Sequence, residues 1–314
     1  MSLKALQSLL HKILLGVKAP VLVVLLGFAP FVAALWIFYR RRARMRAQAN
    51  ESFDEFALRP PGESLRLRID ATAAKLEVYV FHLFAASCGA VVLTLLSPRS
   101  KELWVAAACA AYLIFAYARY VPKLFGAARV LQEHRSNFVG ERLVGEELGR
   151  LRLRGYSVFH DVPFDGSNID HILVGPGGVF AVTTKTRRRP AKVHDGSRAK
   201  VIYDGASLYF PIGTEARWVT LAKKNATHLT SWMSQMSGQS LNATALLTLP
   251  GWTVERRGQS EVNVLNPMEI AAVIESAPAS TLAPDTIDRL SRELIERCRL
   301  KRESTDSRPP HSLS

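Results

Sequence analysis

The most constraining feature of this chain is a run of 20 residues without a charged side chain, residues 20–39. An α-helix needs about 20 apolar residues to cross the hydrocarbon core of a bilayer, so this run predicts a membrane-spanning helix. It is too long for the apolar core of a signal peptide, and it lacks a small-residue cleavage site. Five arginines stand within residues 40–46, and such a cluster marks the cytoplasmic end of a span.

Two further apolar runs, residues 78–96 and 103–119, are separated by only six residues and predict a helical hairpin. About three spans are therefore expected, with residues 1–121 as a membrane anchor and residues 40–75 as a basic cytoplasmic loop. We expect an integral protein of a bacterial inner membrane, with lipid as a partner and the C-terminal part in the cytoplasm. As an alternative for the N-terminus, the first 18 residues lie on the membrane surface as an interfacial helix.

Charge and polar residues narrow the choice of partners. The formal net charge of +14 suits anionic partners, either lipid headgroups or phosphate backbones. His82 lies in an apolar run, where it serves a proton path or, more simply, faces a neighbouring helix or the membrane interface. Other polar residues do not recur across the predicted spans, which disfavours a transporter. The three cysteines, an odd number without metal-ligand spacing, predict no disulfide framework.

Residues 122–300 have the pattern of an α/β domain. Apolar residues at three- and four-residue intervals predict a helix over 126–154, which Gly155 would end as a left-handed cap. This order of elements predicts a mixed α/β sandwich, with residues 301–314 as a disordered polar tail. The remaining patterns predict strands at 156–162, 168–174, 179–186, 243–249 and 262–266, a hairpin at 200–211, and helices at 218–237, 267–276 and 284–300.

A polar patch on an otherwise apolar hairpin is the main candidate site. If the turn is centred between Pro176 and Gly177, Asp170 lies opposite Thr183 on the neighbouring strand. Lys185 then shares the face of Thr183, because side chains alternate along a strand. A carboxylate and a lysine on buried strands need a function or a partner, since unpaired buried charge is costly. The plainer alternative is a structural ion pair between Asp170 and Lys185.

The residues around this hairpin resemble a known family. The pair Gly140–Glu141 and the string from Ile169 to Thr186, IDHILVGPGGVFAVTTKT, resemble the nuclease-related domain, NERD. That domain is similar to the PD-(D/E)xK restriction-endonuclease-like superfamily. The resemblance extends over roughly residues 135–276 and includes the later segments LPGW and NVLNP. It implies a restriction-endonuclease-like mixed α/β sandwich after the membrane helices.

The resemblance also implies roles for individual side chains. By position, Asp170 would bind a metal ion, Lys185 would orient or activate the attacking water, and Glu141 would complete the site from a helix. The implied cofactor is Mg²⁺, because hard carboxylate oxygens suit it and it lowers the pKa of a bound water. Thr183 stands where the family has a glutamate. This metal position therefore offers a neutral hydroxyl, and Mg²⁺ is predicted to bind weakly.

Three outcomes stay open for this altered site. Glu141, or a neighbouring carboxylate such as Glu146 or Glu147, compensates for the missing charge. Alternatively, the domain binds nucleic acid without cutting it. In the third outcome it has become a scaffold for a protein partner.

A basic run adjoins the patch, and we interpret it as a contact surface for DNA or RNA, with a merely solvated loop as the alternative. It comprises Arg187, Arg188, Arg189 and Lys192. Three functions are thus in competition. The first is a membrane-tethered nuclease that hydrolyses phosphodiesters with Mg²⁺. The second is an inactive relative that binds nucleic acid or protein at the membrane. The third is a transport or signalling protein with an unrelated domain.

Overall fold

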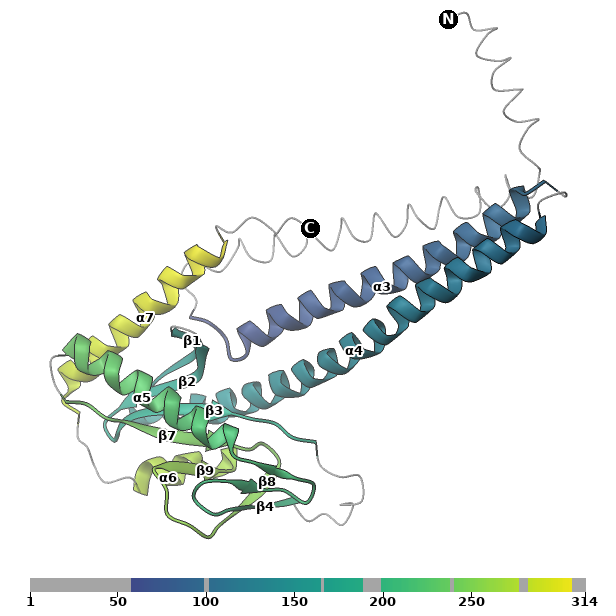
Figure 1. The fold of residues 1–314 in the computed structure, drawn as a ribbon. Coiled ribbons are helices and arrows are strands. Elements are labelled where there is room, and N and C mark those ends of the chain that lie inside the picture. The colour runs from purple at the N-terminus through teal and green to yellow at the C-terminus, as the bar shows by residue number, and fades with distance from the viewer. Residues whose placement is uncertain are drawn as a thin grey trace, which may run out of the picture. The chain divides into compact units, whose positions relative to one another are not determined.

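The computed structural model describes residues 58–98, 102–164, 167–188, 199–237, 240–276 and 282–306 (Figure 1). Several predicted features lie outside the described residues: the span at 20–39, the arginines of 40–46, and the side chains Arg189 and Lys192. The described part forms two compact units. One contains Ala71–Leu131, and the other combines Leu58–Asp70 with the chain from Gln132 onward.

Two long helices, which contact each other side by side, provide the first unit. The ring of His82 stacks on that of Tyr120 with their centroids 5.1 Å apart, and Ser87 Oγ lies 3.2 Å from the hydroxyl of Tyr117. The simpler interpretation of His82, a contact with a neighbouring helix, is confirmed. The helices are α3 (Glu63–Leu96) and α4 (Glu102–Arg150).

Both helices are long and apolar enough to cross a membrane. Large apolar side chains along α4 point into open space, with Leu103 80%, Trp104 78% and Ile114 71% exposed. An apolar core helix of a soluble protein would have the same composition, but its side chains would be covered. The exposure of these apolar side chains therefore suggests insertion into a membrane.

The helices differ in extent from those predicted. α3 begins at Glu63, inside the segment predicted as a loop, and α4 joins the predicted span at 103–119 and the predicted helix at 126–154 into one. Pro122 lies inside α4 without ending it. A proline removes only one backbone hydrogen bond, and a helix with helix-forming residues on both sides continues through it with at most a kink. After a 3₁₀ turn, η2 (Leu151–Arg154), Gly155 ends the helix at φ +81°, as predicted.

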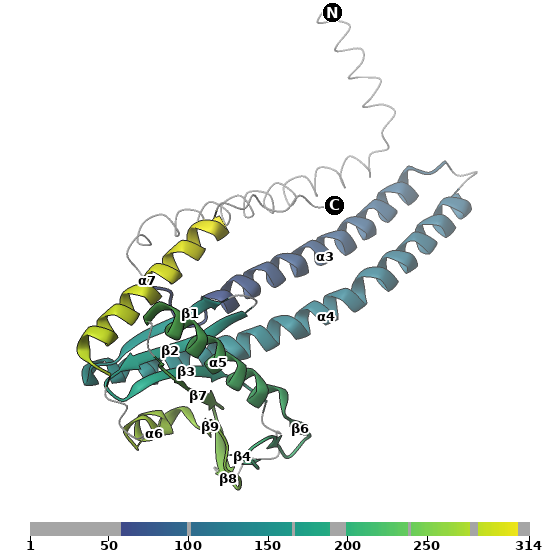
Figure 2. The same cartoon turned by 60° about the vertical axis from the view of Figure 1, so that its left-hand side comes forward.

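The second unit contains a mixed five-stranded sheet in the order β1-β2-β3-β7-β9 (Figure 2). The first three strands are antiparallel neighbours, whereas β3, β7 and β9 are parallel. Each corresponds to a predicted strand. Their bounds are β1 Ser157–Phe164, β2 Ser167–Gly175, β3 Gly178–Thr184, β7 Ala243–Thr248 and β9 Val262–Leu265.

A smaller sheet has the order β6-β5-β4-β8. The hairpin predicted at 200–211 supplies its centre, but β6 and β8 were not predicted. β8 has only five residues and pairs in parallel with β4, more than forty positions earlier in the chain. A local sequence pattern does not predict such a pairing. The strands are β4 Ala199–Tyr203, β5 Leu208–Tyr209, β6 Thr214–Glu215 and β8 Trp252–Arg256.

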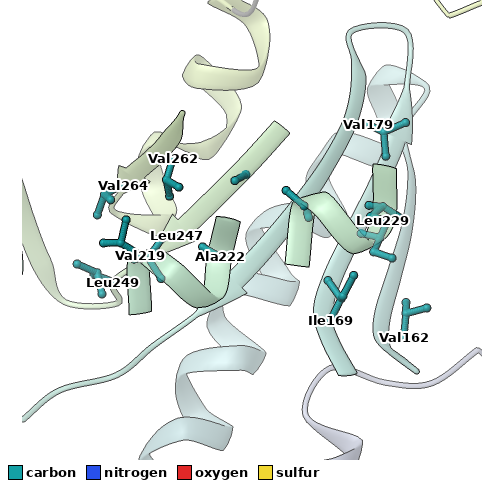
Figure 3. Close-up of a cluster of buried hydrophobic side chains, with 14 of the residues drawn as sticks. Val162, Ile169, Val179, Val219, Ala222, Leu229, Leu247, Leu249, Val262 and Val264 are labelled. Atoms are coloured by element: carbon teal, nitrogen blue, oxygen red, sulfur yellow. The ribbon is translucent and has the colours of Figure 1, made fainter. Parts of the chain in front are cut away.

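Helices cover both faces of the five-stranded sheet. Alternation along β2 sends Ile172 and Val174 into one core layer and Leu173 into the other. Figure 3 shows the first layer, in which strand residues such as Leu247 and Ile169 lie in one cluster with Ala222 and Leu229 of α5. The predicted mixed α/β sandwich is confirmed. The first layer is covered by α5 (Arg217–Ser237) and α7 (Pro284–Asp306), and the second by α4 and α6 (Ile270–Ser276).

The ends of the last helices also differ slightly from the prediction. A short 3₁₀ turn, η3 (Pro267–Glu269), precedes α6, and Asn266 caps it through its side chain. α7 continues to Asp306, six residues beyond the predicted end at 300, so the first part of the tail predicted as disordered is helical. Residues 307–314 lie outside the described part of the chain.

Candidate active site

The close approach of α4 to the end of β3 places the candidate site. A Cβ atom on Gly140 would lie 2.2 Å from Thr186 Cγ2, so any larger residue would force Thr186 to move. The hydroxyl of Thr186 also donates a hydrogen bond to Asn137 Oδ1 on the same helix. Because Glu141 follows Gly140, this contact brings its carboxylate to the end of the central hairpin. The Gly140–Glu141 pair thus has a physical reason that residue type alone did not reveal.

The register of the hairpin is as predicted. His171 pairs with Val182 and Ile172 with Ala181, and the same register carried one step further sets Asp170 opposite Thr183. The Thr184 backbone N–H donates a 2.7 Å hydrogen bond to Asp170 Oδ2, which orients that carboxylate. Asp170 and Thr183 therefore lie side by side near the start of β2 and the end of β3.

Glu141, Asp170 and Lys185 come together in this place. Burial, followed by the negative charges of Asp170 and Asp161, raises the pKa of Glu141 from 4.5 to about 8, against the opposing charges of Lys185 and Arg68. Burial also raises the pKa of Asp170, although Lys185 and the Thr184 N–H oppose the change. Both carboxylates have raised pKa values although Lys185 lies near them. Carboxylates whose negative charge is not fully balanced are typical of a cation-binding or catalytic site.

Thr183, which replaces the family glutamate, is fully buried and already has a partner. The Asn225 Nδ2 group of α5 donates a 2.9 Å hydrogen bond to Thr183 Oγ1. The Oδ1 atom of the same amide is buried without a hydrogen-bond partner. This position holds neutral oxygen atoms instead of a carboxylate.

Glu146 and Glu147, the other candidates for a compensating charge, point to partners of their own. Glu146 pairs with Arg142 at 3.6 Å, and Glu147 pairs with Arg150 at 3.0 Å. Both pairs are between neighbours on α4. Of these three glutamates on α4, Glu141 is the one whose charge acts on Asp170.

Asp161 is a further acidic residue near the site, and the sequence pattern did not single it out. Its carboxylate accepts hydrogen bonds from Ser64 N (2.7 Å), Ser64 Oγ (2.9 Å) and Asn168 Nδ2 (2.9 Å), and Arg59 Nη1 lies 3.9 Å away. It therefore caps the start of α3. Its backbone has φ +50°, a strained conformation for a residue other than glycine, so the surrounding contacts must hold it.

The segment before α3 covers Glu141. A Cβ on Gly62 would lie 2.8 Å from the ring of Phe138 and 3.5 Å from Glu141 Oε2, and Gly62 has φ +79°. A side chain would be excluded there by both space and backbone conformation. This cover is one cause of the burial that raises the pKa of Glu141.

The two described arginines of the basic run, Arg187 and Arg188, have different surroundings. The guanidinium of Arg187 lies 4.4 Å from the centre of the Phe210 ring and donates to the carbonyl of Ile212. Its own carbonyl accepts a 3.1 Å hydrogen bond from Trp252 Nε1. Arg187 thus joins the smaller sheet to the end of β3, while Arg188 is exposed.

His171 lies on the face opposite Asp170, as predicted. Its Nδ1 lies 2.9 Å from Nδ1 of His160, so one ring donates to the other. Burial lowers the pKa of His160 to about 4, and burial followed by the charge of the neighbouring ring lowers the pKa of His171 well below its usual value. Both rings are therefore neutral at pH 7 and have a packing role beneath the sheet.

The side chains of the site show whether it could bind the Mg²⁺ ion that the family resemblance implies. Among the described residues no group of three His, Cys, Asp or Glu side chains could hold a metal ion. Mg²⁺ nevertheless often binds to one or two carboxylates and completes its shell with water and substrate phosphate. Asp170 and Glu141 meet this minimum, and their raised pKa values show that a nearby cation would stabilise their ionised forms. The site fits a weakly held Mg²⁺.

Fold and site together define a mixed α/β domain with two carboxylates and a lysine at the end of its central hairpin. Residues 136–241 of the chain match the family model of the nuclease-related domain, NERD, which confirms the resemblance for this segment. The match contains Glu141, Asp170, Thr183 and Lys185, whereas the segment Leu58–Asp70 lies outside it. Searches among curated proteins and among solved structures found no match.

Proposed function

We propose that this chain is a membrane-tethered nuclease-related protein whose domain hydrolyses phosphodiester bonds of nucleic acid with Mg²⁺. The observation that carries this proposal is the meeting of Glu141 and Asp170, both with raised pKa values, beside Lys185. Their position within the segment that matches a nuclease-related family supports it. A restriction-endonuclease-like fold is the corresponding structural proposal.

The chemistry follows from the charges. Asp170 and Glu141 would hold Mg²⁺, which when bound supplies neutralisation of the phosphate charge and a water of lowered pKa. The Thr184 N–H keeps the Asp170 carboxylate in one orientation. Lys185 places a positive charge beside both carboxylates, where it orients the attacking water or contacts a phosphate oxygen. With Thr183 in place of a glutamate, the site works only at high Mg²⁺ concentration.

The tether is the second part of the proposal. The apolar stretches of α3 and α4, residues 78–96 and 103–119, insert into a bacterial inner membrane, and the arginines of 40–46 keep the domain on the cytoplasmic side. The exposed apolar side chains of both helices support insertion. Extraction of the expressed protein from membranes by detergent, but not by carbonate at high pH, is the expected result. Release by carbonate would contradict it.

A second function is favoured by one observation. Thr183 Oγ1 is buried and bonded to Asn225, so the position of the usual glutamate is stably neutral. A domain of this kind would bind nucleic acid or a protein partner at the membrane without cutting. Arg188, which is exposed beside the site, would contribute to such binding.

The test uses the full-length protein in detergent micelles, incubated with plasmid DNA or single-stranded RNA and with Mg²⁺, Mn²⁺ or a chelator. Wild type is compared with Asp170→Asn and Lys185→Met, each expected to lower cleavage about 100-fold or more. Glu146→Gln, on the exposed side of α4, is the matched control and should cleave normally. Cleavage that persists in Asp170→Asn would show that the activity arises elsewhere.

Thr183→Glu separates the two functions. If the remaining site is intact, the added carboxylate lowers the Mg²⁺ concentration needed for half-maximal cleavage. If neither wild type nor Thr183→Glu cleaves, while both bind nucleic acid, the second function is supported. Thr183→Glu also removes the hydroxyl that accepts the buried hydrogen bond from Asn225, so the variant could fold poorly. Its thermal unfolding shows whether it is folded.

A further inference from the structure

The first two turns of α3 belong to the nuclease-related unit although they precede the family match by more than sixty residues. Asp161 fixes them through its three hydrogen bonds to Ser64 and Asn168. Leu65 is 7% exposed and adds an apolar anchor. This stretch of α3 is therefore held firmly against the domain.

The helical period decides which arginine of α3 faces the site. Arg68 follows Ser64 by four residues, so both lie on the face that Asp161 holds toward the domain. Gly62, just before the helix, approaches Glu141 closely, with 3.5 Å between its ideal Cβ position and Glu141 Oε2. Arg66 lies on another face and pairs with Glu63 at 2.8 Å. Arg68 is thus on the side of α3 that carries Ser64, and its side chain is exposed to solvent.

Charge supports this placement. The positive charge of Arg68 acts on both Glu141 and Asp170 and lowers the pKa of each, as a guanidinium within reach of both carboxylates would. Lys185 acts on the same two groups. Two cationic side chains therefore stand beside two carboxylates, one from the hairpin and one from α3.

We propose that Arg68 binds a phosphate of the nucleic-acid backbone at the mouth of this site, and that the start of α3 is thereby part of the substrate-binding surface. The inference rests on the proposed function. A guanidinium presents paired N–H donors that match two phosphate oxygens, which an ammonium group cannot do. Thr183 leaves the site one carboxylate short and its Mg²⁺ weakly held, so a fixed cation at this edge supplies part of the charge that the phosphate requires.

The experiment measures binding and cleavage separately. Full-length protein in detergent micelles is titrated against a fluorescein-labelled single-stranded DNA in a chelator, by anisotropy, at several salt concentrations. Arg68→Ala should weaken binding about tenfold or more and reduce the salt slope by about 0.7, the value for one phosphate contact on a single strand. Arg68→Lys should keep the salt slope but recover only part of the affinity. Arg66→Ala, two positions earlier, should match wild type.

The outcomes distinguish this inference from the proposed function. If Arg68→Ala matches Arg66→Ala in affinity and salt slope while wild type cleaves, Arg68 is not a phosphate contact and the nuclease proposal stands. If no variant cleaves but Arg68→Ala loses affinity and slope, the binding role stands and the catalytic proposal fails. Wild type that binds no nucleic acid overturns both. Arg68→Ala should stay folded and lose only a little thermal stability, because its charge also acts on Glu141 and Asp170; a large loss of stability would assign Arg68 a structural role instead.

Discussion

Glu141 should make the stability of the domain depend on pH in a way that a single substitution removes. Its pKa is 4.5 in an unfolded chain and about 8 in the folded domain. Below pH 4.5 the carboxyl is protonated in both states and contributes nothing. Between these values the unfolded chain is ionised and the folded one is not, so stability falls as pH rises, by about 1.4 kcal/mol for each pH unit. Above pH 8 the loss is complete.

Glu141→Gln keeps the shape of the protonated side chain without the ionisable proton. At pH 7 the wild-type domain has lost at most about 3.4 kcal/mol through this group, and the substitution should recover a large part of it. The difference between variant and wild type should vanish near pH 4.5 and grow toward pH 8. Tryptophan fluorescence reports the urea unfolding of the full-length protein in micelles between pH 5 and 9, because Trp218, Trp232 and Trp252 lie in this unit.

Controls make the result specific. Glu146→Gln, exposed on the same helix, should leave the pH dependence of stability unchanged. Millimolar Mg²⁺ should flatten the pH dependence of wild type, since a bound cation stabilises the ionised carboxylates, and should affect Glu141→Gln less. A difference between Glu141→Gln and wild type that is constant from pH 5 to 9 would refute the reasoning, because burial would then not act through ionisation.

Three further predictions concern stability. Asp161→Ala should cost about 2 kcal/mol or more in urea unfolding, because Ser64 loses its capping partner and alanine fits poorly at φ +50°; unfolding equal to wild type would contradict the capping role. Leu148→Ala should cost about 3 kcal/mol because the side chain is 0% exposed, while Leu153→Ala, 94% exposed, should cost nearly nothing, and equal effects would refute the packing described. Below pH 6.5 the unfolded chain protonates His160 but the folded domain does not until about pH 4, so stability should fall between these values; His160→Asn should show a smaller acid loss in the same assay, and an unchanged loss would rule the ring out as its source.

The parts of the fold that the sequence predicted are those that depend on local patterns. The turn around Pro176 and the two-residue alternation were enough to set Asp170 opposite Thr183 and to send His171 to the other face, because register follows from turn position and side-chain period. The helix that Gly155 ends was equally readable, since a left-handed cap is a local requirement. The candidate carboxylates and Lys185 came from the family resemblance combined with that register.

Tertiary structure decided how the site is closed and charged. Asp161 contacts Ser64, 97 positions away in the sequence, Arg187 lies on Phe210, and Thr186 packs against Gly140. In each case the pattern of one segment gives no information about the segment that it contacts. Periodicity shows which face of an element is buried but not which distant side chain it will meet. The sequence alone therefore determined the apolar helical segments, the α/β sandwich and the register of the hairpin. Burial, which raises the pKa of Glu141 and draws α3 into the site, arises only when these elements pack together.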